Sequence, residues 1–306
     1  MSHLCQKPGW HSLHTFREMA DSAFREKLSN AEPNVRLAAL QQLAGASADP
    51  ELLPDLLRIC LNDRTGHNRL AAVKALKAYW PHPEVQAAYS ARLSDELYIA
   101  AEVVATLGRV ADQPAVAMLE KSFETSSSIW VRIKVLGQMH RAPQAQLHRF
   151  IAQSGCLSHK DERIRAATVA LLARVKNPSL KQVFAQRLKD PCPRVRSNAL
   201  ESLGAGFPDQ ETAKLMVACL ADPHHRVRSV AIKFLLEFGV TQAEEHLRAM
   251  VESTSFLFRG AAAWVLREVA PNEKRVQWIH ALAQDPSEQV SSMAEMALAQ
   301  HGPSGA

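Results

Sequence analysis

Cysteine, glycine and aromatic residues are all scarce in this chain of 306 residues, which contains 12 Gly and 6% aromatic residues. No CxxC pair occurs, so neither a zinc site nor a disulfide framework is indicated by its five cysteines, Cys5, Cys60, Cys156, Cys192 and Cys219. No apolar run reaches the length of about 18 residues that a membrane-spanning helix needs. The opening residues, MSHLCQKPGWHSLHTF, show no secretory signal, so we expect a cytoplasmic protein. Cys60 and Cys219 occupy the same position of a repeated pattern, in ICLND and ACLAD, and we expect both to be reduced thiols in the core.

The sequence motifs of the common enzyme and metal sites are also missing. There is no GxSxG, GxxxxGK[ST], GxGxxG or HExxH. Thirteen histidines are present, but His224 and His225 are adjacent, and two neighbouring positions on one helix do not both reach the same ion. We therefore expect no catalytic, cofactor-binding or metal-binding residues.

A unit of about 32 residues, in contrast, occurs nine times along the chain. Each copy has one position, which we call the anchor, followed by small or apolar residues four, five and eight positions later. Successive anchors are 31 to 33 residues apart, and they are Val35, Asn68, Ile99, Val131, Ile164, Val195, Val227, Phe258 and Val290. A period this steady is typical of a stack of identical supersecondary units.

Residues 208–239 show how one unit is predicted to fold. Apolar residues recur at the three-and-four spacing of a helix face until Asp222-Pro223, where the proline ends the first helix. A second helix follows from Val227 and closes at Gly239. No alternating strand pattern is present, so we predict about eighteen helices, the first near residues 12–29. Residues 10–302 would form one continuous solenoid, and residues 303–306 a short tail, within a single domain over 1–306.

The unit resembles the short HEAT-like repeats named for phycobilisome lyases, over nearly the whole chain. The residues that carry the resemblance are Asp190, Pro191, Val195, Arg196, Ala199, Leu200, Leu203 and Gly204, echoed at Asp222, Pro223, Val227, Arg228, Ala231, Ile232 and Leu235. The resemblance implies an all-α fold, a right-handed α-solenoid of about nine helical hairpins. It also implies that the second helix of each hairpin lines the concave surface.

An arginine follows the anchor in seven of the nine units, the exceptions being Ala100 and Ser291. At 100° per residue this position lies within the apolar arc of the helix, so its side chain cannot point freely into solvent. We expect these arginines to bind turn carbonyls and the carboxylates found three to five residues before an anchor, namely Asp63, Asp95, Asp161, Asp190, Asp222 and Asp285. Their role would be structural, and Ala100 and Ser291 would mark weaker joints.

Two features are predicted on the exposed face of the second helices. The first is a basic band interrupted by Glu102, Glu201, Glu237 and Glu268, and its members are Arg109, Lys134, Arg141, Arg163, Arg174, Arg194, Arg226 and Lys233. The second is an apolar patch near the C-terminus formed by Trp264, Met293 and Met296, with Val230 and Leu257 beside them. Trp130 is expected to pack against its own turn.

These features predict a non-catalytic scaffold or adaptor that binds an acidic or helical protein segment on its concave face. Three alternatives remain open. The band could follow a nucleic-acid backbone, as in HEAT-like DNA glycosylases, which would need a carboxylate beside Trp264. It could be a solvated face without a partner. A role as a bilin-lyase-type subunit would rest on fold analogy alone.

Overall fold

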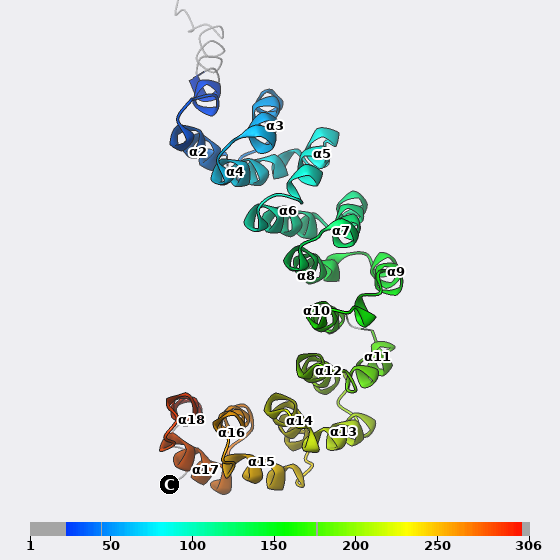
Figure 1. The fold of residues 1–306 in the computed structure, drawn as a ribbon, viewed down its shortest axis with the longest axis vertical. Coiled ribbons are helices and arrows are strands. Elements are labelled where there is room, and N and C mark those ends of the chain that lie inside the picture. The colour runs from blue at the N-terminus through cyan, green and yellow to red at the C-terminus, as the bar shows by residue number, and fades with distance from the viewer. Residues whose placement is uncertain (1–22, 44, 176, 302–306) are drawn as a thin grey trace, which may run out of the picture. The chain divides into compact units, whose positions relative to one another are not determined.

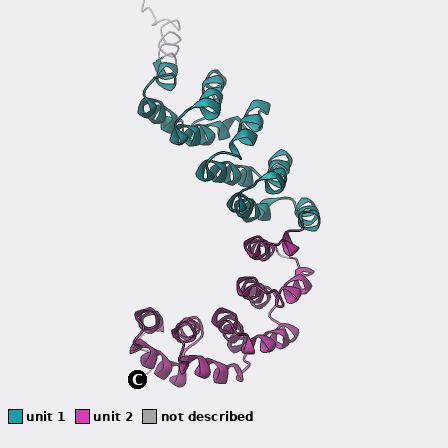
Figure 2. Ribbon diagram, viewed as in Figure 1, with its two compact units in different colours: residues 1–154 teal, residues 155–306 magenta. Residues whose placement is uncertain are grey.

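The structure of the chain, a computed structural model, describes residues 23–43, 45–175 and 177–301. These residues form helices and turns with no strand among them. The chain divides into two compact units, residues 1–154 and 155–306, called unit 1 and unit 2 below (Figure 2). Of the first predicted helix, residues 23–28 are helical, while 12–22 and the tail 303–306 lie outside the described residues.

Unit 1 contains helical hairpins joined by short turns (Figure 1). Its α-helices are α2 (Pro33–Gln42), α3 (Leu53–Asn62), α4 (Gly66–Leu76), α5 (Pro83–Arg92), α6 (Leu97–Val110), α7 (Gln113–Thr125), α8 (Ile129–Gln138) and α9 (Gln144–Ser154). Three short 3₁₀ helices extend them: η1 (Pro50–Leu52), η2 (Lys77–Tyr79) and η3 (Met139–Arg141).

Unit 2 repeats the same pattern. Its α-helices are α10 (Glu162–Leu172), α11 (Leu180–Arg187), α12 (Pro193–Gly206), α13 (Gln210–Val217), α14 (His225–Glu237), α15 (Ala243–Val251), α16 (Phe256–Glu268), α17 (Glu273–Ala283) and α18 (Glu288–His301). Two 3₁₀ helices complete it, η4 (Cys156–Ser158) and η5 (Ala218–Ala221). The turn at Asp222-Pro223 is where the sequence predicted it, although α14 begins two residues before Val227.

Each unit has two layers of helices. Every anchor lies on an even-numbered helix, and consecutive even-numbered helices pack side by side within each unit. In unit 2 the even-numbered helices line the inner side of an arc, with α11, α13, α15 and α17 outside (Figure 1). The predicted arrangement of an all-helical solenoid with the second helices on the inside is therefore confirmed for this unit.

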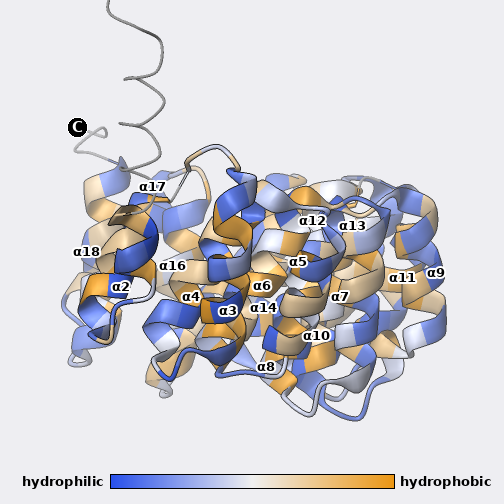
Figure 3. Cartoon of the chain, turned by 90° about the horizontal axis from the view of Figure 1, so that it is seen from above, coloured by the Kyte–Doolittle hydropathy of each residue, from blue (hydrophilic) through white to orange (hydrophobic). Residues whose placement is uncertain are grey.

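The core lies between the two layers of each unit. Seven anchors are buried, whereas Val35 is 36% exposed and Phe258 is half-buried. Cys60, Cys156, Cys192 and Cys219 are free and buried, as expected for Cys60 and Cys219, and burial raises the pKa of Cys60 to about 12. Hydrophobic and hydrophilic residues alternate along each helix in Figure 3, the pattern of helices with one buried face. None of the described helices combines the length and apolar character needed to cross a membrane.

Close approach of α12 and α14 requires a glycine nine residues after the anchor Val195. A Cβ added to Gly204 on α12 would lie 2.3 Å from the ring of Phe234 on α14. The absence of a side chain at Gly204 thus lets Phe234 lie against the α12 backbone. Gly239, the predicted helix terminator, has a φ of +77°, a left-handed conformation that favours glycine.

Five arginine–aspartate pairs among the described residues link the turns of successive repeats. We call them the Arg–Asp series: Arg36–Asp63, Arg69–Asp95, Arg165–Asp190, Arg196–Asp222 and Arg259–Asp285. In the fourth pair, Nε and Nη2 of Arg196 each lie 2.8 Å from a carboxylate oxygen of Asp222 in the following repeat. Nη1 of Arg196 donates to the carbonyl oxygens of Asp190 and Pro191 in its own turn. The structural role predicted for these arginines is confirmed.

The aspartates of the series also order their own turns. An oxygen of Asp222 accepts a hydrogen bond from the backbone N–H of His224 two residues later. Burial tends to raise the pKa of Asp222, but the hydrogen bonds from Arg196 and His224 outweigh it, so this pKa is lowered from 3.8. Each series aspartate is therefore ionised at neutral pH and holds two repeats together through one carboxylate.

Three residues depart from this pattern. Asp161 accepts from the backbone N–H of Arg163 and pairs with the Arg163 side chain, so the expectation that it joins an arginine of another repeat is wrong. It lies only three residues before its anchor. Arg132 donates to the carbonyl oxygens of Ser126 and Glu124, and Arg228 donates to the Asp222 carbonyl and lies 5.1 Å from the Phe258 ring centroid.

Removing one arginine of the series should destabilise unit 2. Arg196 and Asp222 are only 12% and 10% exposed, and deleting one partner of a buried pair costs about 3 kcal/mol. We expect Arg196→Ala to lower Tm by at least about 5 °C in thermal unfolding followed by circular dichroism. Arg194→Ala, an exposed position on the same helix, is the control and should change stability by less than about 0.5 kcal/mol. Equal Tm values for the two variants would contradict the structural role.

The lowered pKa of Asp222 predicts a loss of stability in acid. A carboxyl group with a folded-state pKa below its unfolded value of 3.8 stabilises the folded state above that pH, and the stabilisation disappears as pH falls toward the folded pKa. Urea midpoints measured between pH 5 and pH 3 should therefore fall less for Asp222→Asn than for the wild type. An identical pH dependence would show that this pair does not couple folding to protonation.

Candidate functional site

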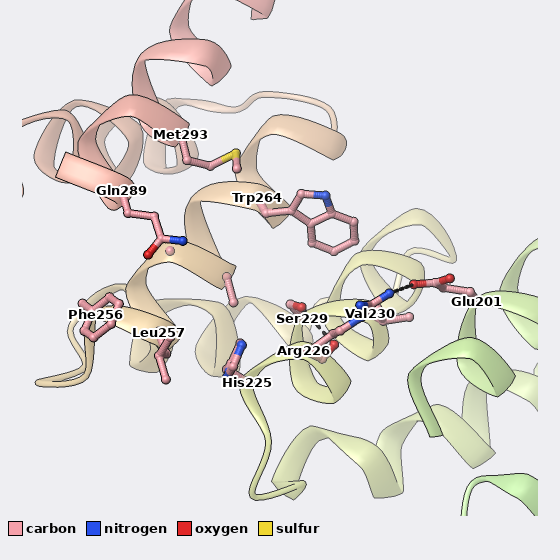
Figure 4. A pocket seen from close by; sticks show the side chains of 12 residues that line it. Glu201, His225, Arg226, Ser229, Val230, Phe256, Leu257, Trp264, Gln289 and Met293 are labelled. Carbon is pink, nitrogen blue, oxygen red and sulfur yellow. Dashed lines mark hydrogen bonds and ion pairs between the residues drawn. The ribbon is translucent and has the colours of Figure 1, made fainter. Parts of the chain in front are cut away.

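A groove of about 460 Å³ crosses the inner helices of unit 2. It lies between α14 and α16, with α12 at one end and α18 at the other (Figure 4). We call it the α14–α16 groove, and the residues that line it are Glu201, His225, Arg226, Ser229, Val230, Phe256, Leu257, Gly260, Ala261, Trp264, Gln289 and Met293.

Apolar side chains form most of the wall near α16 and α18. Phe256 and Leu257 are 45% and 46% exposed at the start of α16, and half-buried Trp264 follows two turns later. Met293 approaches from α18, where its sulfur lies 3.6 Å from Nη1 of Arg267. Gly260 and Ala261 add little side-chain volume between Leu257 and Trp264, which leaves the groove open.

The opposite end of the groove is polar. Figure 4 shows Arg226 directed at Glu201, and the two side chains form an ion pair with an N–O distance of 3.5 Å. Both are about half exposed, at 50% and 47%. A pair this long and this exposed is weak, so either side chain is available to a bound molecule.

His225 lies beside Arg226 and stacks on His224 with ring centroids 4.4 Å apart. Burial lowers the pKa of His225 below 6.5, and the neighbouring His224 and Arg226 lower it further. The backbone N–H of Arg226 donates to Nδ1 of His224, which requires that nitrogen to be unprotonated. His225 is therefore neutral at pH 7 and contributes a flat ring rather than a charge.

The predicted apolar patch is only partly assembled. Trp264, Met293 and Leu257 line the same groove. Val230 is 2% exposed and belongs to the groove floor, while Met296, although 55% exposed, does not line the groove. The sequence did not predict Phe256, His225 and Gln289 as members of the site. The predicted positions started one residue before each anchor, and residues from different helices were not combined into one groove. Phe256 and His225 share one signal, since both lie two residues before an anchor.

The basic band divides between the two units. In unit 1, Arg109 on α6 pairs with Glu102 at 2.9 Å, Lys134 is exposed on α8, and Nη1 of Arg141 donates to Oε1 of Gln138. The band residues of unit 2 are Arg163, Arg174, Arg194, Arg226 and Lys233.

Three of the four glutamates predicted to interrupt the band pair with its members, whereas Glu268 pairs with Arg267. Glu237 lies 3.3 Å from Lys233, which also stacks over the Phe234 ring, and Glu201 pairs with Arg226. Arg174 and Arg194 are exposed. Pairing of this kind reduces the positive potential that the sequence alone suggested.

Two further expectations concern isolated residues. Trp130, expected to pack against its turn, is 52% exposed at the start of α8. The carboxylate that lines the same groove as Trp264 is Glu201, which lies at the polar end and pairs with Arg226. Within the described part of the chain, no three His, Cys, Asp or Glu residues cluster closely enough to hold a metal ion.

Comparisons with known proteins agree with the repeat pattern. Three overlapping matches to the family described as HEAT repeats cover residues 154–235, 185–267 and 212–299. The chain is also 27% identical over 128 residues to the uncharacterized phycocyanin operon protein Z of Pseudanabaena tenuis, which is 40% of this chain and 63% of that protein. The chain thus spans less than two thirds of that relative's length.

Solved structures with the same fold include both small and large solenoids. YibA from Escherichia coli has a TM-score of 0.52 and 15% identity, with 89% of this chain and 97% of that chain covered. The karyopherin Kap121p, bound to the extreme C-terminus of the protein phosphatase Cdc14p, has a TM-score of 0.51 and 15% identity, with coverage of 97% and 42%. Importin beta has a TM-score of 0.50 and 14% identity, with coverage of 95% and 47%. The family matches show HEAT repeats over residues 154–299, and the shared fold and the nine anchors agree with repeats of this kind along the described chain.

Proposed function

We propose that this protein is a non-catalytic scaffold or adaptor, and that the α14–α16 groove of unit 2 holds an acidic, amphipathic helix of a protein partner. The observation that carries the proposal is the apolar wall formed by Phe256, Leu257 and Trp264 on the inner side of the repeats. Exposed apolar surface inside a groove favours an interface, because burying it removes that surface from water. Helical repeats commonly bind partners on such concave surfaces.

A helical occupant fits the chemistry of the walls better than an extended one. An extended peptide needs hydrogen-bond partners along its backbone, whereas a helix satisfies its own backbone groups. The groove is built from helices whose backbone groups are internally bonded, and its only side-chain amide is that of Gln289. Apolar residues of an amphipathic helix would lie against Trp264 and Leu257, and Met293 would adapt to their shape.

The polar end of the groove favours an acidic residue on that helix. Arg226 is half exposed and only loosely paired with Glu201, so a carboxylate from a partner can replace Glu201 beside it. Arg194 occupies the same position one repeat earlier and is exposed. Such charges mainly raise association rates and fix orientation, while the apolar contacts supply most of the binding energy.

Substitution of Trp264 should weaken binding strongly. Helical peptides can be selected from a phage-displayed library of acidic amphipathic sequences, and their Kd values measured by fluorescence anisotropy. Loss of a central aromatic residue typically costs about 2 kcal/mol or more, so we expect Trp264→Ala to raise Kd by at least about 30-fold.

Trp130 in unit 1 provides a control, since it is also an accessible tryptophan on an even-numbered helix. Trp130→Ala should leave the Kd within about twofold. Failure to select any helical peptide, or equal effects of the two substitutions, would count against the groove as the binding site. Binding of DNA rather than peptide in a gel shift, steeply weakened by salt, would favour the nucleic-acid alternative.

Substitutions of the two members of the Arg226–Glu201 ion pair should change the Kd for an acidic helix in opposite directions. Glu201→Gln removes the carboxylate that competes for Arg226, so it should lower the Kd. Arg226→Gln removes the cation and should raise it, each by about three- to tenfold at low salt, with both effects reduced at 0.5 M NaCl. Effects of the same sign would show that the partner does not use this charge.

A further inference from the structure

A second apolar hollow lies next to the groove, at the C-terminal ends of α10 and α12, where the turns after these helices and Phe184 of the outer helix α11 also line it. It has a volume of about 720 Å³ and shares Glu201 with the α14–α16 groove. We call it the α10–α12 hollow, and its lining residues from the two helices are Ala170, Asn198, Glu201, Ser202, Ala205 and Gly206. The rings of Phe184 and Phe207, with centroids 6.2 Å apart, add an aromatic wall.

Small side chains line the hollow where other repeats carry longer ones. Ala205 lies ten residues after its anchor, where later and earlier repeats carry long polar side chains such as Arg109, Arg174 and Glu237. Ala170 and Ala173 on the facing helix are also small, and all three alanines are exposed. A row that carries a charged side chain in five of the nine repeats therefore has an apolar depression at this repeat.

Two polar side chains of the hollow, those of Asn198 and Ser202, are already used within the protein. Nδ2 of Asn198 donates to the carbonyl oxygen of Ala166, and the Ser202 hydroxyl donates to the carbonyl oxygen of Asn198. The surface left to a ligand is thus mainly the alanine methyl groups and the Phe207 ring. Such a surface fits an aliphatic or aromatic side chain, not a polar small molecule.

From these observations, and resting on the proposed function, we infer that the bound helix carries two apolar anchoring segments. One enters the α14–α16 groove and the other the α10–α12 hollow, and an acidic residue between them meets the Arg226–Glu201 pair. Both depressions lie on the same face, since Ala170, Glu201 and Trp264 each lie six residues after an anchor.

Helix geometry sets the distance between the two segments. Adjacent packed helices are about 8–10 Å apart, and the depressions are separated by two to three such steps, roughly 20–30 Å. A helix rises 1.5 Å per residue, so the two apolar segments should be about 13–20 residues apart. A partner helix of at least about five turns is therefore required.

The test uses the full chain and a phage-displayed library of 28-residue acidic amphipathic helices. Alanine scanning of a selected peptide should reveal two sensitive segments with the expected separation. A photo-crosslinking residue, p-benzoylphenylalanine, placed in one segment should label residues 198–207, and in the other residues 256–264.

Filling the hollow should remove only one of the two contacts. Ala205→Phe replaces an exposed residue, so the core is unaffected, and it should raise the peptide Kd by about tenfold. A peptide that lacks the segment for the α10–α12 hollow should bind the wild type and the Ala205→Phe variant with equal Kd. Ala299→Phe, another exposed alanine on an inner helix but away from both depressions, is the control and should stay within about twofold.

The outcomes separate this inference from the proposed function. A single sensitive segment, with wild-type affinity for Ala205→Phe and weakened binding by Trp264→Ala, would overturn the second anchoring site and leave the groove as the binding site. Insensitivity to Trp264→Ala, or a library from which no binder is recovered, would overturn both.

Discussion

The Arg–Asp pairs between successive turns are the constraint on which the geometry of each unit depends. A HEAT hairpin buries its apolar faces only by stacking on its neighbours, and apolar packing alone would let two hairpins slide along their axes. In Arg196–Asp222 the guanidinium binds two carbonyls of one turn and two carboxylate oxygens of the next. This arrangement fixes the register between repeats through directional hydrogen bonds, because a small shift would leave buried charges unpaired.

A fixed register places equivalent side chains of successive inner helices in rows, and changes within a row create the candidate site. The residue immediately before the anchor is Arg226 on α14 and Leu257 on α16, so the surface changes from charged to apolar between these two helices. Where the row ten residues after the anchor contains Ala205, a hollow opens beside it. Both depressions are thus local departures from a regular surface, and the partner proposed for them must match their spacing as well as their chemistry.

Charge on the inner surface is more balanced than the net value of +5 suggests. Arg109, Arg226 and Lys233 each have a glutamate partner in the structure. This pairing weakens the case for a continuous polyanion-binding surface, since release of counterions from a nucleic acid requires unpaired cations. It favours a partner that is recognised by apolar contacts and oriented by a small number of charges.

The sequence alone determined the repeat, the helical hairpins, the burial of two cysteines and the arginine that joins neighbouring repeats, because each follows from local periodicity and from the position of Arg196 within an apolar arc. Only the tertiary structure decided which exposed residues meet. Trp264 and Glu201 are 63 residues apart in the chain, and Met296 is excluded from a groove that Met293 enters three residues earlier. Such differences depend on how helices of separate repeats pack and on the direction of individual side chains, neither of which is encoded in the spacing of the repeat.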